Sequence, residues 1–289
     1  MNPAGPVGYA LVRPAEYVGG DDTDALWRGC VAIADRRRRG DAPMAPHLAG
    51  EWSAAARSLF ALYRPLLALP SAHPFVIGHL GQSLDGRIAT GNGDSCFING
   101  TANLTHLHRL RALCDAVLVG AGTVLADDPQ LTTRMVAGPD PTRIVLDPSR
   151  RLTARYRVCA DPRAPTLVAR YEPDGDIGRA QVIVARRSGD GIDLAGLLAE
   201  LAARGLHAVL VEGGGVTVSR FLQAGLLDRL QIAVAPLIIG SGRPGLQLPE
   251  VLRLDECLRP PCQCYPMGDD VLFDLALRPA APAGPDGRR

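Results

Sequence analysis

The sequence predicts an α/β fold with a mostly parallel central sheet flanked by helices and an additional helical segment at the N-terminus. From residue 74 onward, short apolar runs alternate with stretches of helical periodicity. Two of these runs pass directly into glycines and then into a helix. Residues 1–73 show helical patterns instead. With 289 residues, 47% of them hydrophobic, the chain can form one large domain plus an extension.

Individual elements follow from periodicity and from helix end signals. In the extension, helices are expected at 24–39 and 51–69, the second interrupted near Pro65. Strands are expected at 75–80, 116–120, 143–147, 166–169, 182–185, 206–211, 230–234 and 271–277. Further helices are expected at 101–113 (with Thr101 as N-cap), 194–204 and 216–224. Residues 1–73 are therefore assigned to the extension, 74–278 to the main domain and the Pro/Ala/Gly-rich 279–289 to a disordered tail.

The composition excludes several kinds of chemistry. All 31 Lys+Arg residues are arginine, so no lysine can form a Schiff base or complete a phosphate-binding P-loop. A net charge of +1 provides no electrostatic reason to expect nucleic acid or an acidic membrane as partner. The basic run 36–39 is interpreted as a solvated helix end in preference to a nucleic-acid patch. Residues 1–10 lack the pattern of a signal peptide, so the expected location is the cytoplasm.

The seven cysteines do not predict a disulfide framework, because their number is odd and the chain is not small. Cys257, Cys262 and Cys264 form a cluster that has no second pair of ligands at zinc-binding spacing. Free thiols are the favoured interpretation, with a metal site as the less favoured alternative. No metal is expected.

Two glycine-rich strand ends are the first candidates for a binding site. One apolar strand runs into Gly120-Ala121-Gly122-Thr123 and the other into Glu212-Gly213-Gly214-Gly215. Each turn can present backbone N–H groups and a helix N-terminus to a phosphate. The first lacks the third glycine of a Rossmann fingerprint and can equally be a tight turn. Glu212 is interpreted as an acceptor for substrate, with a surface cap as the alternative.

Further polar residues are expected near the same strand ends. Thr123 and Asp127 are four residues apart and share one face if they lie on a helical turn. Arg134 follows on an extended stretch and suits phosphate recognition, although a surface salt bridge is a common alternative. Ser83 and Arg87 flank the Asp85-Gly86 turn and can face the same cleft. No nucleophile elbow or Cys/His pair is evident, which favours hydride transfer by a bound cofactor.

Six segments together carry a family resemblance. They read SLDGRIA at 83–89, DSCFI at 94–98, RLRALCDAVLVGAGTVLADDPQLTTR at 109–134, RIVLD at 143–147, VEGGG at 211–215 and AGLLDRLQIAVAPLIIG at 224–240. In order and spacing they resemble the pyrimidine reductases of riboflavin biosynthesis over about residues 74–277. That family forms the C-terminal domain of a bifunctional deaminase/reductase and has a dihydrofolate-reductase-like fold.

The resemblance implies a reaction and a set of contacts. The reaction is the NADPH-dependent reduction of 5-amino-6-(5-phosphoribosylamino)uracil, with hydride delivered to C1′ of the opened ribosylamine. The implied NADPH contacts are Gly81, Thr123, Asp127, Gly214, Gly215, Val216 and Thr217. The implied substrate contacts are Ser95, Arg111, Leu131, Arg134 and Glu212. The two arginines are expected to hold the phosphate, Glu212 or Arg87 to assist proton delivery, and the family implies a homodimer.

The chain also departs from the family pattern. Phe97 stands where the family usually has Trp, and Pro148 stands where a cofactor-side Ser is expected. Residues 1–73 show no zinc-deaminase motif. Two alternatives therefore stay open: a related reductase of another pyrimidine or pteridine in a specialised pathway, and a nucleotide-binding protein without catalysis that uses the extension to bind a partner.

Overall fold

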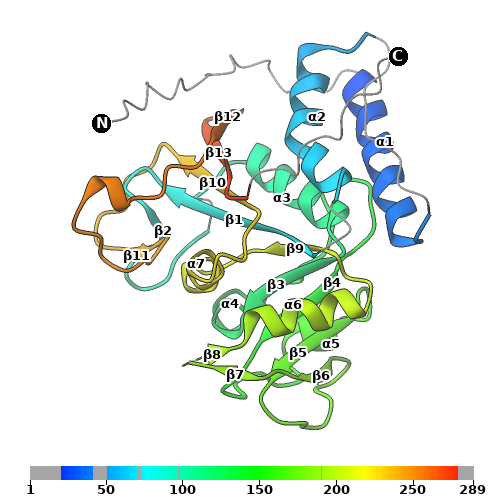
Figure 1. Ribbon diagram of the computed structural model, residues 1–289, viewed down its shortest axis with the longest axis vertical. Coiled ribbons are helices and arrows are strands. Elements are labelled where there is room, and N and C mark those ends of the chain that lie inside the picture. Colours follow the sequence, from blue (N-terminus) through cyan, green and yellow to red (C-terminus); the bar gives the residue numbers. More distant parts are fainter. Residues whose placement is uncertain (1–20, 42–50, 70–72, 97, 190, 279–289) are drawn as a thin grey trace.

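A nine-stranded sheet organises the fold in the computed structural model, which describes residues 21–41, 51–69, 73–96, 98–189 and 191–278 (Figure 1). The strand order is β12-β13-β10-β1-β9-β3-β4-β5-β6. The bounds are β1 Phe75–Ser83, β3 Ala116–Gly120, β4 Thr142–Leu146, β5 Thr166–Arg170, β6 Gln181–Val184, β9 Ala208–Val211, β10 Arg229–Ala235, β12 Cys262–Met267 and β13 Asp270–Ala276. The strands from β10 to β6 run parallel, and β13 is antiparallel to both β10 and β12.

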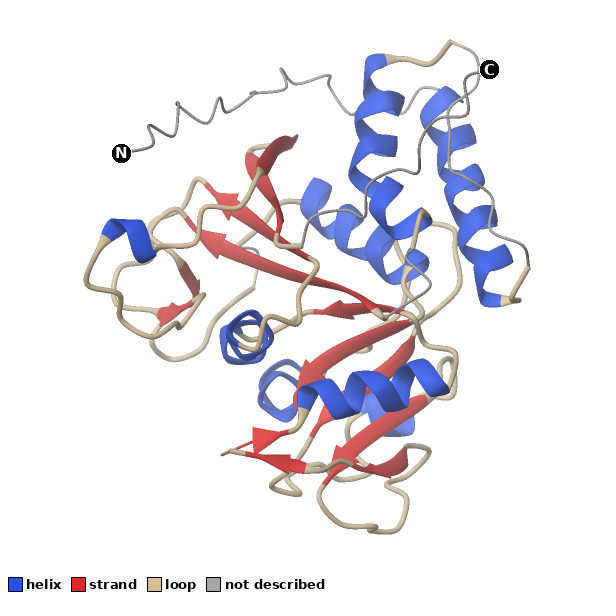
Figure 2. Ribbon diagram, viewed as in Figure 1, coloured by secondary structure: helices blue, strands red, loops and turns tan. Residues whose placement is uncertain are grey.

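Helices cover both faces of this sheet (Figure 2). One apolar layer contains side chains of α1 Asp21–Arg38, α2 Ala54–Leu67, α3 Thr101–Leu113, α4 Ala121–Asp127 and α5 Arg157–Ala160. The other layer contains side chains of α6 Leu194–Ala203 and α7 Gly215–Gln223. Short pieces complete the described chain: β2 Arg87–Ala89, β7 Arg187–Ser188, β8 Gly191–Ile192, β11 Arg243–Pro244 and the 3-10 helix Leu254–Glu256. The predicted α/β architecture is confirmed.

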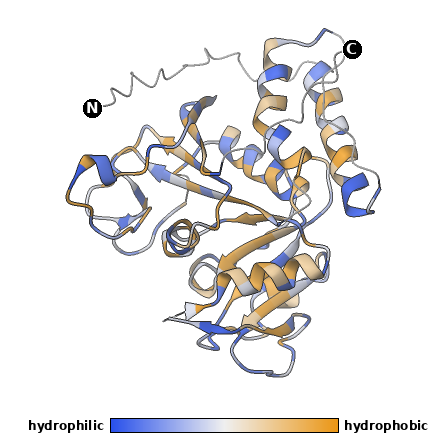
Figure 3. Ribbon diagram, viewed as in Figure 1, coloured by the Kyte–Doolittle hydropathy of each residue, from blue (hydrophilic) through white to orange (hydrophobic). Residues whose placement is uncertain are grey.

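The central strands are apolar on both faces, and for this reason they appear in the sequence as unbroken hydrophobic runs. All four residues of β9 are buried, as are the first four of β3 (Figure 3). A parallel strand between two helical layers has no solvated face, so hydrophobic residues do not alternate with polar ones. Both strands end at the same edge of the sheet, where the glycine turns begin.

The N-terminal helices pack into the same apolar layer as the sheet. Leu59, Leu62 and Leu66 of α2 are buried together with Leu110 and Leu113 of α3. The predicted interruption near Pro65 is wrong: α2 continues through the proline to Leu67. A proline removes one backbone donor, and the buried face of α2 outweighs this loss.

Two further expectations about helix ends are also wrong. Helix α3 already begins at Thr101, so its N-cap is Gly100, and the Gly100 N–H donates to Asp270 Oδ2 at 2.8 Å. The basic run 36–39 is not simply solvated. Arg37 and Arg38 both form ion pairs with Asp115, at 2.7 and 3.3 Å.

Some expectations fall outside what the structure tests. Residues 1–10 and the tail 279–289 lie outside the described residues. The domain boundary at residue 73 stays a prediction, and apolar packing crosses it. Within the described ranges, no helix is both long and apolar enough to cross a bilayer.

Candidate active site

A cavity of about 1090 Å³ opens at the carboxyl ends of the central parallel strands. This is where open α/β sheets bind their ligands. Of the residues expected to contact cofactor or substrate or to act in catalysis, all but two line it: Gly81, Ser95, Arg111, Thr123, Asp127, Leu131, Glu212, Gly214, Gly215, Val216 and Thr217. The structure therefore brings residues from β1, α3, α4, β9 and α7 to one site.

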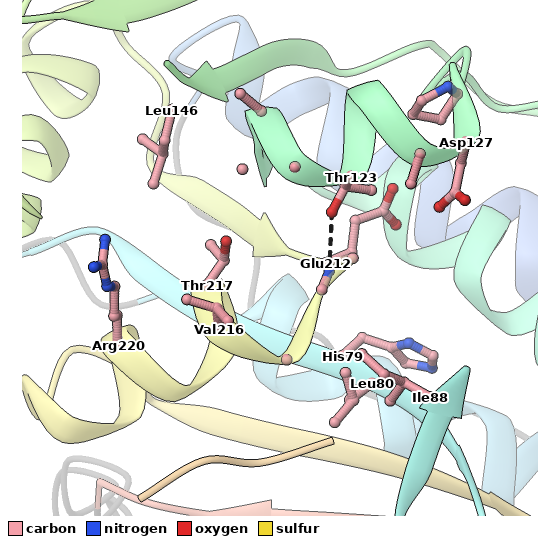
Figure 4. Close-up of a pocket in the computed structure, with 18 of the residues that line it drawn as sticks. His79, Leu80, Ile88, Thr123, Asp127, Leu146, Glu212, Val216, Thr217 and Arg220 are labelled. Atoms are coloured by element: carbon pink, nitrogen blue, oxygen red, sulfur yellow. Dashed lines mark hydrogen bonds between the residues drawn. The ribbon is translucent and has the colours of Figure 1, made fainter. Parts of the chain in front are cut away.

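The two glycine turns meet at the middle of the cavity. The Gly214 N–H donates to Thr123 Oγ1 at 3.0 Å, joining the start of α7 to α4 (Figure 4). A Cβ on Gly120 would lie 2.8 Å from Thr217 Oγ1, and one on Gly215 would lie 1.7 Å from the Gly245 carbonyl oxygen. Gly213 has φ +93°, which L-residues rarely adopt. The glycines are thus required by close backbone packing, and this packing exposes helix N-termini to the cavity.

A buried ion pair lies beside these turns. Arg111, in the last turn of α3, donates from Nη2 to Glu212 Oε1 at 2.7 Å and from Nε to Oε2 at 3.3 Å. The two side chains are only 8% and 5% exposed. Arg111 Nη1 also donates to the Thr132 carbonyl oxygen at 3.2 Å. Glu212 is therefore buried just after β9 and accepts from Arg111, so it is not a surface cap, and its contact with substrate stays a prediction.

Leu131 is held in an unusual backbone conformation next to this pair. Its φ is +54°, and its side chain is buried in the cavity wall. A left-handed conformation at a non-glycine residue is strained and often marks a binding site. The following carbonyl, that of Thr132, is the one that Arg111 contacts.

Asp127 and Asp128 have different environments although they are neighbours. Asp127 lines the cavity, and burial raises the pKa of its carboxyl against the opposing effect of Arg243. Asp128 ends α4 with φ 39° and accepts from the Arg157 backbone N–H at 2.7 Å and from Arg157 Nε at 3.1 Å. The predicted shared face of Thr123 and Asp127 is confirmed, because both lie on α4 and both line the cavity.

His79 and Asn103 are cavity residues that the sequence reading missed. His79 lies on β1, and its Nε2 is 3.2 Å from Asn103 Oδ1. An amide oxygen only accepts, so Nε2 carries the proton. Burial, with a smaller contribution from the Arg111 charge, lowers the pKa of His79 to about 4. His79 could have been identified from the sequence, because it is a polar residue inside an otherwise apolar strand.

Arg87 and Arg134 are the two expected site residues that do not line the cavity. Arg87 lies on β2, whose other residues Ile88 and Ala89 do line it. Arg134 is exposed and donates from Nη1 to Thr132 Oγ1 at 3.0 Å. Burial and the charge of Arg111 lower the pKa of Arg134, so the two guanidinium groups lie near each other. Their proposed roles stay predictions.

Ser83 also differs from expectation. Its hydroxyl is buried, donates to Asp85 Oδ1 at 2.6 Å and accepts from the Arg87 N–H at 2.9 Å. These bonds stabilise the Asp85-Gly86 turn, in which Gly86 has φ +77°. Ser83 is therefore part of the turn and does not face the cleft. Cys257, Cys262 and Cys264 are free thiols, and among the described residues no three His, Cys, Asp or Glu side chains are grouped so that they could hold a metal ion.

Comparison with known proteins identifies the family. The model of the RibD C-terminal domain matches residues 74–261. The chain belongs to this family. The resemblance seen in the sequence is thereby confirmed, and the two N-terminal helices lie outside the matched region.

Several relatives are similar over most of the matched region. A protein of Methanothermobacter thermautotrophicus named 2,5-diamino-6-ribosylamino-4(3H)-pyrimidinone 5′-phosphate reductase is 36% identical over 220 residues, which cover 71% of this chain and 99% of the relative. The riboflavin biosynthesis protein RibD of Mycobacterium tuberculosis is 32% identical over 210 residues, covering 71% of this chain and 55% of the relative. The solved structure of Acinetobacter baumannii RibD has a TM-score of 0.64 at 27% identity and covers 77% of this chain and 62% of that one. The chain thus spans little more than half the length of these RibD proteins.

Proposed function

We propose that this protein is an NADPH-dependent reductase that converts a ribosylamino-pyrimidine 5′-phosphate into the ribitylamino product. The observation that carries the proposal is the single cavity that joins the glycine turns to the Arg111–Glu212 pair. Relatives named as reductases of such a pyrimidine, and RibD proteins, support the same reaction class. The preferred substrate is 5-amino-6-(5-phosphoribosylamino)uracil.

A second ring form is also a candidate. The relative covered over 99% of its length is named for the 2,5-diamino-pyrimidinone, which differs from the uracil form in one ring substituent. Both substrates would present the same ribose and phosphate to Arg111, Arg134 and Glu212. The choice between them would depend on what contacts the pyrimidine ring.

The cavity has two ends that suit the two reactants. Leu146 and Arg220 lie toward one end in Figure 4, and His79, Ile88 and Asp127 lie toward the other, with Thr123 and Thr217 between. Helix N-termini in the middle suit a pyrophosphate. The Leu146 end, with Pro148, Leu194 and Ala195, suits an adenine, and the His79 end suits the substrate.

Arg151 supports NADPH over NADH. It lines the Leu146 end, and its Nη2 would lie 4.0 Å from a Cβ on Gly122. In the described chain its exposed guanidinium makes no side-chain hydrogen bond or ion pair, while its backbone N–H is fixed by Asp147 Oδ1 at 2.8 Å. An anchored cation at the adenosine end suits the additional 2′-phosphate of NADPH.

The protein's own groups then have these roles. NADPH, when bound, supplies the hydride. Glu212, paired with Arg111, accepts hydrogen bonds from the substrate and stabilises positive charge at the reacting C1′–N unit. The apolar side chains of Leu107 and Leu131 limit the access of water to the substrate end of the cavity. Arg87, which does not line the cavity, stays a predicted proton-delivery residue.

The test is a turnover assay with both ring forms. Purified protein is mixed with NADPH and either the uracil or the diaminopyrimidinone substrate, and NADPH oxidation is followed. Faster turnover of the uracil form supports it as the preferred substrate. Faster turnover of the diaminopyrimidinone form would make that form the preferred substrate instead. NADPH binding without turnover of either form would contradict both in favour of another pyrimidine or pteridine. No binding at all would favour a non-catalytic role.

We also expect a homodimer that functions in the cytoplasm. Light scattering coupled to size-exclusion chromatography measures the first, and a mass of one chain, 30.6 kDa, would contradict it. Fluorescence microscopy of the tagged full chain in its native cells measures the second.

A further inference from the structure

The N-terminal helices contact α3 on the side away from the cavity, at three successive levels. The Tyr63 hydroxyl is 2.7 Å from His106 Nδ1. The Trp27 ring packs 5.5 Å from the Arg109 guanidinium. Arg37 and Arg38 donate to the carbonyl oxygens of residues 112, 113 and 114 at 2.7–2.9 Å. Helix α3 meanwhile contributes Asn103, Leu107 and Arg111 to the cavity.

The Tyr63 contact completes a buried hydrogen-bond chain whose direction can be deduced. Gln231 Nε2 donates to Asp274 Oδ1 at 3.3 Å, so its Oε1 is the atom that faces His106 Nε2 at 2.7 Å. His106 Nε2 must then carry the proton, which leaves Nδ1 as an acceptor. Tyr63, from the extension, donates to Nδ1. A buried ring nitrogen left without a donor is destabilising, so this contact holds α2 against α3.

Arg37 and Arg38 fix the last turn of the same helix. The final carbonyls of an α-helix have no partner within it, and these two guanidinium groups supply partners. Both also pair with Asp115, whose Oδ2 accepts from the N–H groups of His207 and Ala208 at 2.9 and 2.8 Å. Asp115 thus links the end of α3 to the start of β9. Arg111 belongs to that last turn, and Glu212 follows the end of β9.

The extension also contacts the segment that carries Leu131. Trp27 Nε1 donates to the Ala137 carbonyl oxygen at 2.9 Å. Gly138 lies against Ala112 and Val31, since a Cβ there would be 2.6 Å from Ala112 Cβ. The Thr132 carbonyl that receives Arg111 Nη1 belongs to this segment. Arg111 has two partners. Thr132 belongs to a segment that the extension contacts. Glu212 follows β9, whose start is bonded to Asp115, the residue with which Arg37 and Arg38 pair.

We propose that the α1–α2 hairpin is a positioning element for the substrate end of the cavity, in which Arg37, Arg38 and Tyr63 hold α3 so that Arg111 meets Glu212. The inference rests on the proposed function, since the substrate is the ligand that this end would bind. The hairpin lies outside the region matched by the family model, and it contacts the side of α3 opposite the cavity. Tyr63, Arg37 and Arg38 are positioning residues and touch neither reactant.

The test compares two double variants of the full chain. Arg37→Gln/Arg38→Gln removes the two guanidinium groups that contact the end of α3. Arg36→Gln/Arg39→Gln removes the same charge from the same end of α1, where both side chains are exposed. Steady-state KM is measured for the pyrimidine substrate and for NADPH separately, together with kcat and Tm. We expect the substrate KM of the first variant to rise about tenfold, its NADPH KM to stay within twofold, and the second variant to resemble wild type.

The possible results are distinguishable. A fall in Tm or kcat with an unchanged substrate KM would show a purely structural role and overturn the inference. An equal rise in both KM values would also overturn it. If the first variant does not fold, Tyr63→Phe removes only a hydroxyl and keeps the ring, and the same selective rise in substrate KM is expected. Wild-type protein that reduces neither pyrimidine would refute the proposed function itself.

Discussion

The Arg111–Glu212 pair shows how one contact can bind and orient at the same time. Glu212 is buried at a strand end, and a buried carboxylate is costly unless a cation and hydrogen bonds compensate its charge. Arg111 compensates it through two nitrogens and also contacts the Thr132 carbonyl. The pair therefore fixes the Glu212 carboxyl in the wall of the cavity, where the proposed substrate would meet it.

Glu212→Gln tests this role. The amide keeps the shape of the carboxylate but loses its charge and leaves Arg111 buried without its anion. We expect kcat/KM to fall at least tenfold, equivalent to about 1.4 kcal/mol of transition-state stabilisation. Glu200→Gln is the control, because Glu200 pairs with Arg204 on the exposed side of α6. Turnover equal to that of the control would place Glu212 outside the functional site.

Arg151→Gln tests the cofactor assignment. Loss of a charge-assisted contact to the 2′-phosphate is expected to weaken NADP⁺ binding about tenfold or more and to leave NAD⁺ binding unchanged. Calorimetric titration with each dinucleotide measures this without turnover. Arg150→Gln is the matched control, because Arg150 is already paired with Glu172 and Asp174 at 2.7 and 2.6 Å. Equal affinities for NADP⁺ in the two variants would refute the assignment.

At the scale of elements, the two strand–glycine–helix units form the middle of the cavity, where the proposed cofactor would lie. β3 leads into α4 and β9 leads into α7, and the two helix starts are joined by Thr123 and Gly214. The sequence reading identified both units because a buried strand that ends in glycines is a strong local signal. It did not show that the turns pack on each other or on Gly245, since those contacts depend on tertiary structure.

Gly215→Ala tests the packing of these turns. Its Cβ would lie 1.7 Å from the Gly245 carbonyl oxygen, so the backbone must move. We expect loss of most dinucleotide binding and a lower Tm. Gly29→Ala is the opposite case, because a Cβ on that α1 residue meets nothing within 4 Å. The alanine should raise stability by about 0.5–1 kcal/mol through helix propensity. Wild-type affinity in Gly215→Ala would contradict the assignment of this turn to the cofactor.

Element boundaries illustrate what local sequence can and cannot predict. Strands such as β3 were placed correctly because their apolar runs are unambiguous. The cap of α3 was misplaced because its partner, Asp270, is distant in sequence. Arg37 and Arg38 resembled a solvated run for the same reason: their partners are the carbonyls and the carboxylate at the end of α3. Short elements such as β2 and β11 pair across about 150 residues and have no local signal.

At the scale of the whole molecule, three buried histidines make stability depend on pH. Burial lowers the pKa of His79 and His108 to about 4 and that of His106 to about 3, against an ordinary value of 6.5. Below pH 6.5 the unfolded chain therefore binds protons that the folded chain does not.

Stability is consequently expected to fall as pH decreases from about 6.5 toward 4. Each histidine contributes at most about 1.4 kcal/mol per pH unit in that range. The dependence weakens below pH 4, where His79 and His108 are protonated in the folded protein as well, and His106 follows at about pH 3. Chemical denaturation at successive pH values measures this. His106→Gln should reduce the slope, because it removes one of the three buried titrating groups. A stability that is constant from pH 7 to 4.5 would contradict the prediction.

The whole chain combines the RibD C-terminal domain, which carries the candidate site, with two N-terminal helices outside the matched region. Sequence motifs identified the family, and the structure brings most of the expected residues to one cavity. His79 and Asn103 were missed because neither lies in a recognisable motif, and the contact between the hairpin and α3 depends on side chains far apart in sequence. Long-range packing therefore accounts for most of what the sequence did not reveal.

The most direct test of the central claim is deuteride transfer. NADPH carrying deuterium at the transferable C4 position is incubated with the protein and the ribosylamino-uracil phosphate, and the product is analysed by NMR. The account predicts one deuterium at C1′ of a ribitylamino product, in amount equal to the NADP⁺ formed. Oxidation of NADPH without deuterium at that carbon would contradict it.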